Sequence, residues 1–494
     1  MYRCPSTMCF KEVITMETSN SIQKWLEENA GAYTGMADKI WEYAEVAWRE
    51  HRSAALQIKH LSEQGFSITE NVADIKTAFS AEYGSGKPVI GFIGEYDALP
   101  GLSQKTVPRK EAVAEGGSGH GCGHNLLGTG GVAAAVAIAR WLDETGKSGT
   151  VRYYGCPAEE QLLGKTFMAR AGSFDDLDAA LNFHPAVYNM PAKGMLVGLY
   201  DVRFRFTGTP SHAGGSPHRG RSALDAVELM NVGVNYLREH VPEKVRMHYT
   251  ITDGGRVPNI VPEYAEVWYF LRAPNRAILD EVFDRVGKVA EGAAMMTETR
   301  VETRLMGGCS SLMNNHYLAD LQYQVMKDIG PIGFTDEEKA FAAKVNTAYP
   351  ERAGDDFFKH FQVPEAERDR IEKAITEPIF GDNFPAMDAI LVETGSTDVG
   401  DVSLITPLSM LWTACYPAGV AAHSWGATAS AGMSIGHKGM MHAAKIMACT
   451  AALLYSEPEH LKNARAEFEK KTAGLPYVCP LPPEIKPEDI VPKM

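Results

Sequence analysis

The sequence predicts an α/β protein in which a mostly parallel sheet carries helices on both faces, with a second, α+β domain inserted into the chain. Two observations predict this architecture. Up to about residue 190, short continuous apolar runs alternate with helical patterns, as in parallel strands joined by crossover helices. From about residue 200, apolar and polar residues alternate, which indicates a sheet with one face in solvent.

The larger domain begins with helical spacing of apolar residues between Ser21 and Phe66. Buried strands and helices should then alternate. We expect strands at 89–93, 150–154 and 179–183, and helices at 132–144 and near 165–172. Carboxylates follow the first of these strands, in Glu95-Tyr96-Asp97, which is where open α/β sheets bind ligands.

The inserted domain starts with a strand in which Val202, Phe204 and Phe206 occupy alternate positions. A helix, two strands, a helix and a strand should follow, near 222–240, 246–252, 264–271, 276–296 and 300–305. This order, β-α-β-β-α-β, is that of a ferredoxin-like domain. We place the domains at 20–198, 199–311 and 312–474, the first and last being two parts of the larger domain.

The C-terminal part of the chain contains two further distinctive segments. Residues 336–379 are highly charged and contain Pro350 and Pro364, which predicts surface helices and long loops that could cover a cleft. Residues 475–494 contain six prolines and should be extended. A long helix is expected at 440–455.

Composition excludes several classes of protein. The 494 residues include 45% hydrophobic and 22% charged residues, as in ordinary globular proteins of more than one domain. The net charge of −14 argues against nucleic acid or an anionic membrane surface as the main partner. A small acidic substrate stays compatible with this charge, because it needs only a local basic pocket.

The cellular location is expected to be cytoplasmic. The eight cysteines are scattered along a long chain, unlike a secreted disulfide scaffold. Cys122, Cys156 and Cys415 lie close to candidate functional stretches, which fits a reducing compartment. Residues 1–20 lack the pattern of a signal peptide, and we find no run of about 18 apolar residues that would predict a membrane span.

The most informative stretch is Gly119-His120-Gly121-Cys122-Gly123-His124-Asn125, which precedes an apolar helix. Cys122 and His124 would point to the same side of an extended chain, between glycines that let a ligand approach closely. A thiol and an imidazole suit a soft or borderline divalent metal. Alone, the pair is half a site, and a free cysteine beside a surface histidine is the alternative.

Further candidates follow the predicted strands. Glu159 and Glu160 follow the strand at 150–154, His184 follows the strand at 179–183, and His423 lies in an apolar stretch. Taken singly, the glutamates could be a solvated pair and the histidines could be satisfied core residues. Taken together with Cys122 and His124, they offer five ligands, which is more than one tetrahedral zinc needs and suits two divalent ions, with a spare carboxylate to accept a proton.

Five stretches in order make the chain resemble the di-metal amidohydrolases, a family that includes hippurate hydrolase, auxin-amino-acid hydrolases and bacterial aminoacylases. The stretches are Glu95-Tyr96-Asp97-Ala98-Leu99-Pro100, Gly121-Cys122-Gly123-His124-Asn125, Cys156-Pro157-Ala158-Glu159-Glu160, Asn182-Phe183-His184-Pro185 and Gly208-Thr209-Pro210-Ser211-His212-Ala213. Three more resemble the branch formed by the B-type subunit of p-aminobenzoyl-glutamate hydrolase, at 175–180, 214–220 and 395–402.

The resemblance implies a role for each matching residue. Cys122, His124, Glu160, His184 and His423 would hold two divalent ions, Mn²⁺ or Zn²⁺, and Glu159 would be the general base. His212 would stabilise the oxyanion, commonly from a partner subunit, although a polar loop histidine is the alternative. Asn259 and Arg272 would bind the substrate carboxylate, unless Arg272 is merely an exposed strand residue, and Asp97 would support a ligand. Which ligand holds which ion is left open.

Two departures from the family pattern affect the site. Asn125 stands where many relatives have aspartate, which removes a charge near the metals and leaves the metal preference open. His423 lies in Ala422-His423-Ser424-Trp425, unlike the His-Ser-Pro context of the auxin-conjugate branch. We therefore expect a different pocket for the acyl group.

The implied activity is hydrolysis of the amide of an N-acyl or N-aroyl amino acid, with p-aminobenzoyl-glutamate as the leading substrate. The alternatives are an aminoacylase or dipeptidase, a non-catalytic partner subunit, and a hydrolase with Cys122 as nucleophile. The inserted domain would be a lid and dimerisation domain. It would support a homodimer or a heteromer with a related subunit.

Overall fold

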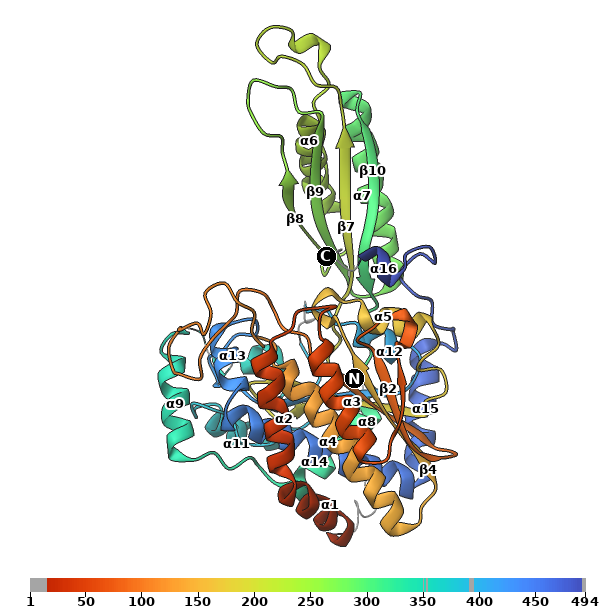
Figure 1. Ribbon diagram of the computed structural model, residues 1–494, viewed down its shortest axis with the longest axis vertical. Helices are drawn as coiled ribbons and strands as arrows, with labels where there is room; N and C mark the ends of the chain where they lie inside the picture. Colours follow the sequence, from red (N-terminus) through yellow and green to blue (C-terminus); the bar gives the residue numbers. More distant parts are fainter. Residues whose placement is uncertain (1–15, 350, 352–353, 391–394, 491–494) are drawn as a thin grey trace.

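The computed structural model describes residues 16–349, 351, 354–390 and 395–490 (Figure 1). A broad lower body carries a narrow, elongated upper body, and the chain crosses between them at the base of the upper one. We call these the large domain and the small domain. The small domain is formed by elements between Gly198 and Cys309. The boundaries at 198, 311 and 474 stay predictions.

The large domain is built on a mixed sheet whose centre is parallel. Within the described residues seven strands form it, in the order β1-β2-β4-β3-β5-β11-β6. The four central strands, β4, β3, β5 and β11, run parallel, and the strands outside them pair antiparallel. The bounds are β1 Ser67–Glu70, β2 Phe79–Ser85, β3 Val89–Glu95, β4 Gly149–Cys156, β5 Ala179–Ala186, β6 Met190–Pro191 and β11 Leu408–Ala414. The predicted α/β class is confirmed.

Helices cover both faces of this sheet, which explains why its central strands are continuously apolar. Along β3, Ile90 and Phe92 pack into the same core as α4 and α14, whereas Val89 and Ile93 pack on the opposite face with α5 and α12. Buried residues of α1, α2, α3 and α8 also belong to the core that contains α4 and α14. The bounds are α1 Met16–Glu28, α2 Ala30–Tyr43, α3 His51–Glu63, α4 His124–Thr145, α5 Gly164–Arg170, α8 His316–Ile329, α12 Val399–Ser403, α13 Trp425–Ala431, α14 Ser434–Ser456 and α15 Pro458–Thr472.

Helix α4 begins at His124, so the predicted start at residue 132 was wrong. Glycines 128, 130 and 131 disfavour a helix in isolation, but here they allow close packing. A Cβ on Gly128 would lie 2.4 Å from the carbonyl oxygen of Glu95. Among the described residues α4 is the helix long and apolar enough to cross a membrane, yet 94% of its most apolar window is buried inside the fold.

The small domain has the predicted ferredoxin-like order. Its described strands form an antiparallel sheet in the order β10-β7-β9-β8, and helices α6 and α7 share one core on one face. Side chains cap the start of both helices, Ser222 accepting from Asp225 N and Asn275 from Ile278 N. The bounds are β7 Gly198–Thr207, α6 Ala223–Leu237, β8 Arg246–Asp253, β9 Tyr264–Ala273, α7 Arg276–Thr297 and β10 Arg300–Cys309.

The charged region 336–379 contains α9 Asp336–Asn346, α10 Phe357–His360 and α11 Arg368–Ala374. It is not purely a surface feature, because Phe357, Phe361 and Ile371 form a small core with Met190 at the edge of the large sheet. The three helices also carry exposed residues, so the prediction of surface helices is confirmed for this part of the region. Residues 350, 352 and 353 of this region lie outside the described residues.

The C-terminal segment has no regular helix or strand from residue 475 to residue 486, where the backbone N–H of Ile485 donates to the carbonyl of Pro482 in a turn, and it then forms a helical turn, α16 Pro487–Ile490. The prediction was wrong there because proline is well suited to the first position of a helix. The segment is bound to the large domain, with Tyr477 donating to Asp401 and Arg170 donating to the carbonyls of Pro482 and Ile485. The end of the predicted tail, 491–494, lies outside the described residues.

Candidate metal centre and active site

The predicted ligands converge at the carboxyl edge of the parallel strands. His184 lies near the end of β5, and Glu160 follows β4 in a short 3₁₀ turn. Glu95, which was not predicted as a ligand, ends β3 at the same edge. Cys122 and His124 occupy the loop and first turn that begin α4, and His423 lies in the loop after β11. Parallel strands bring their carboxyl ends to one edge, so residues distant in sequence meet there.

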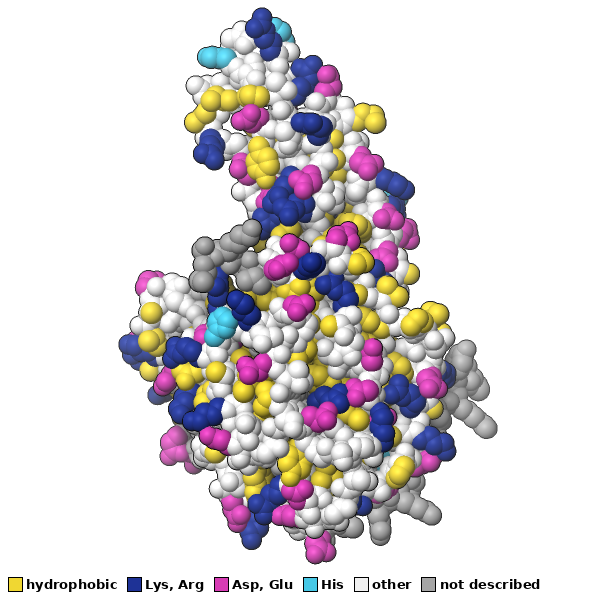
Figure 2. Space-filling view, turned by 45° about the vertical axis from the view of Figure 1, so that its right-hand side comes forward, with side chains coloured by type: hydrophobic (Ala, Val, Ile, Leu, Met, Phe, Trp, Pro, Cys, Tyr) yellow, Lys and Arg dark blue, Asp and Glu magenta, His cyan; other side chains and the backbone are white. Residues whose placement is uncertain are grey.

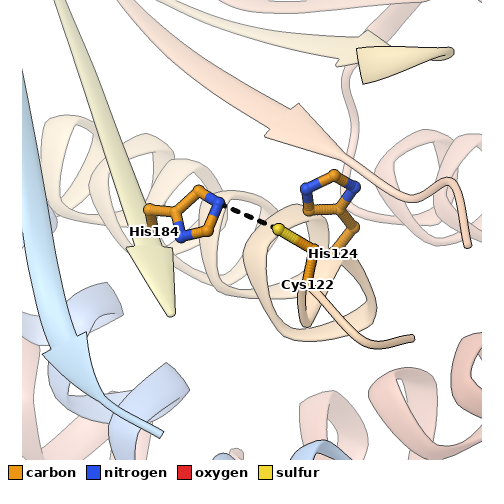
Figure 3. A group of neighbouring side chains, drawn as sticks. All are labelled: Cys122, His124 and His184. Carbon is orange, nitrogen blue, oxygen red and sulfur yellow. Dashed lines mark hydrogen bonds between the residues drawn. The ribbon is translucent and has the colours of Figure 1, made fainter. Parts of the chain in front are cut away.

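The first group of ligand atoms comes from Cys122, His124 and His184, and these atoms lie within 4.8 Å of one another. The Sγ atom of Cys122 is 3.3 Å from Nε2 of His184. Figure 3 shows the three side chains pointing toward one another, His184 from its strand and the other two from the start of α4. Gly123 has φ 78° between Cys122 and His124, and a Cβ there would lie 2.3 Å from the Tyr416 hydroxyl, so glycine is required at this turn.

A second group shares the same thiol and consists of Cys122, Glu160 and His423. Nε2 of His423 lies 3.4 Å from Oε2 of Glu160. The backbone N–H of His423 donates to the carbonyl of Gly121 over 2.9 Å, which joins its loop to the one that carries Cys122. All five predicted ligands therefore lie together, and one thiol belongs to both groups.

A third group consists of Glu95, His124 and Glu159. Nε2 of His124 lies 3.3 Å from Glu95 and 3.7 Å from Glu159, while its Nδ1 donates to Asp97 over 2.9 Å. Asp97 also accepts from the backbone N–H of Glu160 over 2.9 Å. Asp97 therefore orients two predicted ligands, as carboxylates behind metal-binding histidines commonly do.

A buried ion network behind the cluster was not predicted. The ammonium of Lys165 lies 2.8 Å from Glu95 and 2.6 Å from Asp398, and all three side chains are fully buried. The backbone N–H of Lys165 also donates to Asp398 over 2.8 Å. Glu95 and Asp398 stood in the motifs that carry the family resemblance, but a lysine in a helix carries no sequence signal of burial.

Burial dominates the electrostatics of the cluster. It raises the pKa of Glu159 well above the usual range, and the charge of Glu95 adds to this effect. Burial also raises the pKa of Glu160 to about 7 and lowers the pKa of His184 to about 4. Burial opposes the charged form of His124, but Cys122 and Asp97 outweigh it and hold the pKa of His124 well above its usual range.

The donor set fits divalent metal ions. Nε2 of His124, Oε2 of Glu95 and Oε1 of Glu160 are buried and make no hydrogen bond within the described residues, although the first two atoms lie 3.3 Å apart. Buried polar atoms without hydrogen bonds are costly, and bound cations would satisfy them. A thiol, imidazoles and carboxylates are the ligand types of Zn²⁺ and related ions.

Two predicted residues lie away from this cluster. His212 is exposed in the loop after β7, where its Nδ1 accepts from the backbone N–H groups of Gly214 and Gly215. Asn259 is exposed beside it, with its carbonyl accepting from Ala213 N over 3.0 Å. Their two loops, after β7 and after β8, form the outer tip of the small domain in Figure 1. The chain by itself does not bring them to the ligands.

Arg272 lies at the opposite end of the small domain. It belongs to β9, and its guanidinium donates to the Ser396 hydroxyl over 3.1 Å. Ser396 is two residues before Asp398, so Arg272 connects the small domain to the segment that also holds Lys165. Arg272 is half-buried in this position rather than freely exposed on a strand.

Comparisons with known proteins agree with this geometry. The model of peptidase family M20/M25/M40 matches residues 91–485. The chain belongs to this family. Over 473 residues it is 41% identical to the B-type subunit of p-aminobenzoyl-glutamate hydrolase of Escherichia coli (strain K12), covering 94% of this chain and 98% of that protein. The predicted family and the prediction of a hydrolytic enzyme are confirmed.

Two solved structures share the fold of this M20 protein. A putative aminohydrolase from methicillin resistant Staphylococcus aureus matches with a TM-score of 0.62 and 16% identity, over 88% of this chain and 99% of that one. A dinuclear metal binding peptidase of family M20 from Bacillus subtilis matches with a TM-score of 0.55 and 17% identity, over 87% and 99%. At these identities the matches show the fold alone.

Proposed function

We propose that this protein hydrolyses the amide bond between an acyl or aroyl group and an amino acid, with p-aminobenzoyl-glutamate as the leading substrate. The observation that carries the proposal is the pair of ligand groups that share Cys122, with Glu159 beside them in the same buried cluster. The 41% identity to the B-type subunit of p-aminobenzoyl-glutamate hydrolase supports this substrate over other N-acyl amino acids.

The proposed cofactors are two divalent ions, Mn²⁺ or Zn²⁺. Cys122, His124 and His184 would hold one, and Cys122, Glu160 and His423 would hold the other. When bound, such ions polarise the amide carbonyl and make a water molecule more acidic. The dinuclear metal binding named for the Bacillus subtilis relative is consistent with two ions.

Glu159 would move the proton in this reaction. Its carboxylate would accept a proton from the attacking water as the new C–O bond forms, and would pass that proton to the nitrogen as the C–N bond breaks. The products are a carboxylic acid and an amine. Oε2 of Glu159 lies 3.7 Å from Nε2 of His124, so this carboxyl is beside the proposed metal ligands where the proton must be moved. Asp97 would keep His124 oriented throughout.

We also propose that a second subunit supplies His212 and Asn259. Both are exposed at the tip of the small domain, away from the cluster of their own chain. Edge strand β8 exposes Tyr249 and Ile251, and the neighbouring helix α6 exposes apolar side chains, including Tyr236 at 76% exposure. Figure 2 shows hydrophobic side chains at the surface of the small domain, among charged ones. These features support a homodimer, or a heteromer with a related subunit.

Substrate binding would also use Arg272, whose guanidinium lies where the two domains meet and could pair with a substrate carboxylate.

A cytoplasmic location is supported by the six cysteines of the described residues, which are all free thiols. The formal charge of −14 supports the absence of a nucleic acid partner.

The test is hydrolysis of p-aminobenzoyl-glutamate by the purified protein before and after metal removal. We expect a chelator to abolish hydrolysis and Mn²⁺ or Zn²⁺ to restore it. Activity that is indifferent to the chelator would instead favour Cys122 as a nucleophile, although burial raises the pKa of this thiol and disfavours a reactive thiolate. Hydrolysis of other N-acyl amino acids or dipeptides alone would replace the leading substrate.

A further inference from the structure

The loop that carries His423 needs support from outside itself. It runs from residue 415 to residue 424, between β11 and α13. His423 has φ 58°, a left-handed conformation that is uncommon for residues other than glycine. Its side chain is 54% exposed, so packing around the imidazole does little to fix it. Such a conformation persists where surrounding contacts enforce it.

Tyr349, three residues beyond the end of α9, makes contacts on the C-terminal side of His423. Its hydroxyl donates to Oγ of Ser424 over 2.9 Å and accepts from the backbone N–H of Gly426 over 3.0 Å. Its ring stacks on Trp425, with ring centroids 5.7 Å apart and an angle of 28° between the planes. A Cβ on Gly426 would lie 2.6 Å from the Tyr349 hydroxyl, so glycine is what permits this approach.

Asn346, the last residue of α9, makes the matching contact on the N-terminal side of the loop. Its side-chain oxygen accepts from Gly419 N over 2.9 Å, and its amide nitrogen donates to the carbonyl of Pro378 over 2.9 Å. The end of α9 therefore contacts the loop on both sides of His423. No hydrogen bond from α9 to His423 itself is seen in the described residues.

Helix α9 is itself anchored to the core of the large domain. Thr335 and Glu338 form a reciprocal cap at its start, and Glu338 accepts from Lys438 of α14 over 2.7 Å. Ala342 and Val345 are fully buried on the inner face of α9. A helix fixed at its beginning and packed along one face is a rigid support for the contacts at its end.

We propose that Tyr349 is a positioning residue that holds His423 in place for a divalent ion, with Asn346 fixing the other side of the same loop. The inference rests on the proposed function, because it takes His423 as a ligand. It assigns a role to the charged region 336–379, which begins with α9. A residue that orients a metal ligand commonly changes metal affinity 10–100-fold when it is altered.

The test measures binding of Mn²⁺ to metal-free protein by calorimetry in four single variants and one double variant. Tyr349→Phe removes the hydroxyl and keeps the ring, and His423→Ala removes the ligand. Ser424→Ala removes the acceptor of the Tyr349 hydroxyl. Tyr455→Phe is the matched control, because its hydroxyl donates to Thr150 at the opposite, amino end of β4.

We expect two Mn²⁺ ions to bind the wild type, and His423→Ala to lose one of them. Tyr349→Phe should weaken that same ion at least about tenfold and leave the other unchanged. The effects of Tyr349→Phe and Ser424→Ala should be less than additive in the double variant, since both variants lose the hydrogen bond between these two hydroxyls. Tyr455→Phe should change neither affinity, although it also loses a buried hydrogen bond.

Two results would overturn the inference in different ways. If His423→Ala weakens one ion while Tyr349→Phe weakens neither, or both ions equally, the positioning role is wrong and the proposed metal site stands. If His423→Ala leaves both ions unchanged, the ligand assignment is wrong and the role of Tyr349 falls with it. Thermal unfolding of the metal-free variants shows whether Tyr349→Phe is folded, and this conservative change should preserve the fold as Tyr455→Phe does.

Discussion

The carboxyl edge of the large sheet and the tip of the small domain both carry residues of the family pattern, but in different physical states. At the sheet edge, His124 and Glu159 are buried, and every candidate ligand lies near another from the same chain. At the tip, His212 and Asn259 are exposed, and the hydrogen bonds described for them are with the loops they belong to. One region is preorganised within a single chain, and the other would act on a second subunit under the proposed function.

This contrast suggests how the work of the site is divided. A buried cluster keeps its geometry at the cost of holding several carboxylates away from water. An exposed histidine avoids that cost but reaches its target only through assembly or domain movement. Changes at the sheet edge should therefore affect chemistry and stability directly, whereas changes at the tip should affect chemistry in a way that a second subunit can restore.

The largest effect is expected for Glu159→Gln at the sheet edge. Removal of a general base lowers the rate by as much as about four orders of magnitude. The amide keeps the size of the carboxyl, so both metal affinities should be retained, because Glu159 is outside the two groups proposed to hold ions. The measurement is kcat together with metal content. Retention of most of the activity would remove Glu159 from the mechanism.

The next effect concerns stability. Lys165→Met would leave Glu95 and Asp398 buried without their cation, and loss of one partner of a buried ion pair costs about 3–5 kcal/mol. At the small domain, Glu298→Gln removes a pair with Arg221 that is 70% exposed on the glutamate side, and should cost under about 1 kcal/mol. Urea unfolding of the metal-free proteins measures both. Equal costs would contradict the contrast between the domains.

A slightly smaller effect is expected for His212→Ala. Loss of one oxyanion donor lowers kcat by about 10²–10³-fold. A mixed dimer of His212→Ala and Glu159→Gln chains, isolated with two different tags, has one site with both groups if His212 acts across the interface. It should recover about half of the wild-type activity per dimer, because symmetry makes the two sites equivalent. A mixed dimer as inactive as its parents would mean that His212 acts within its own chain, whereas an active His212→Ala parent would mean that His212 has no role.

Measured per pH unit, the smallest effect is a pH dependence of stability that belongs to the large domain. Burial lowers the pKa of His442 to about 3, whereas an unfolded histidine titrates near 6.5. As the pH falls, the unfolded chain therefore takes up a proton on His442 before the folded chain does. The contribution of neutral His442 to the free energy of unfolding is fully present above about pH 6.5 and is lost as the pH decreases toward 3. His442→Gln should reduce that loss by about 1.4 kcal/mol per pH unit. His218→Gln, at an exposed position in the small domain, is the control.

Much of the site could be predicted because its residues stand in short motifs at strand ends. Cys122 and His124 are two residues apart, and Glu160 and His184 each follow an apolar strand, so local sequence was enough to select them. The small domain was predictable for a similar reason, since its strands alternate and its helices are amphipathic. The antiparallel edge strands of the large sheet are short and carry no such signal.

The parts that could not be predicted depend on contacts between distant residues. Lys165 resembles any helical lysine until the structure places it between Glu95 and Asp398. Tyr349 contacts Ser424 across 75 residues of sequence, and no local pattern announces that contact. The start of α4 was missed because the glycines that make it a poor helix in isolation are the residues that let it approach β3.

The position of β11 bears on the order in which the molecule forms during synthesis. This strand lies between β5 and β6 in the large sheet, yet it is made after every element of the small domain. The small domain can complete its sheet once Cys309 has left the ribosome, about a hundred residues before β11 is finished. The loop with His423 comes later still. The newly made chain therefore carries a finished small domain on an open large sheet, and the candidate metal centre is among the last parts to assemble.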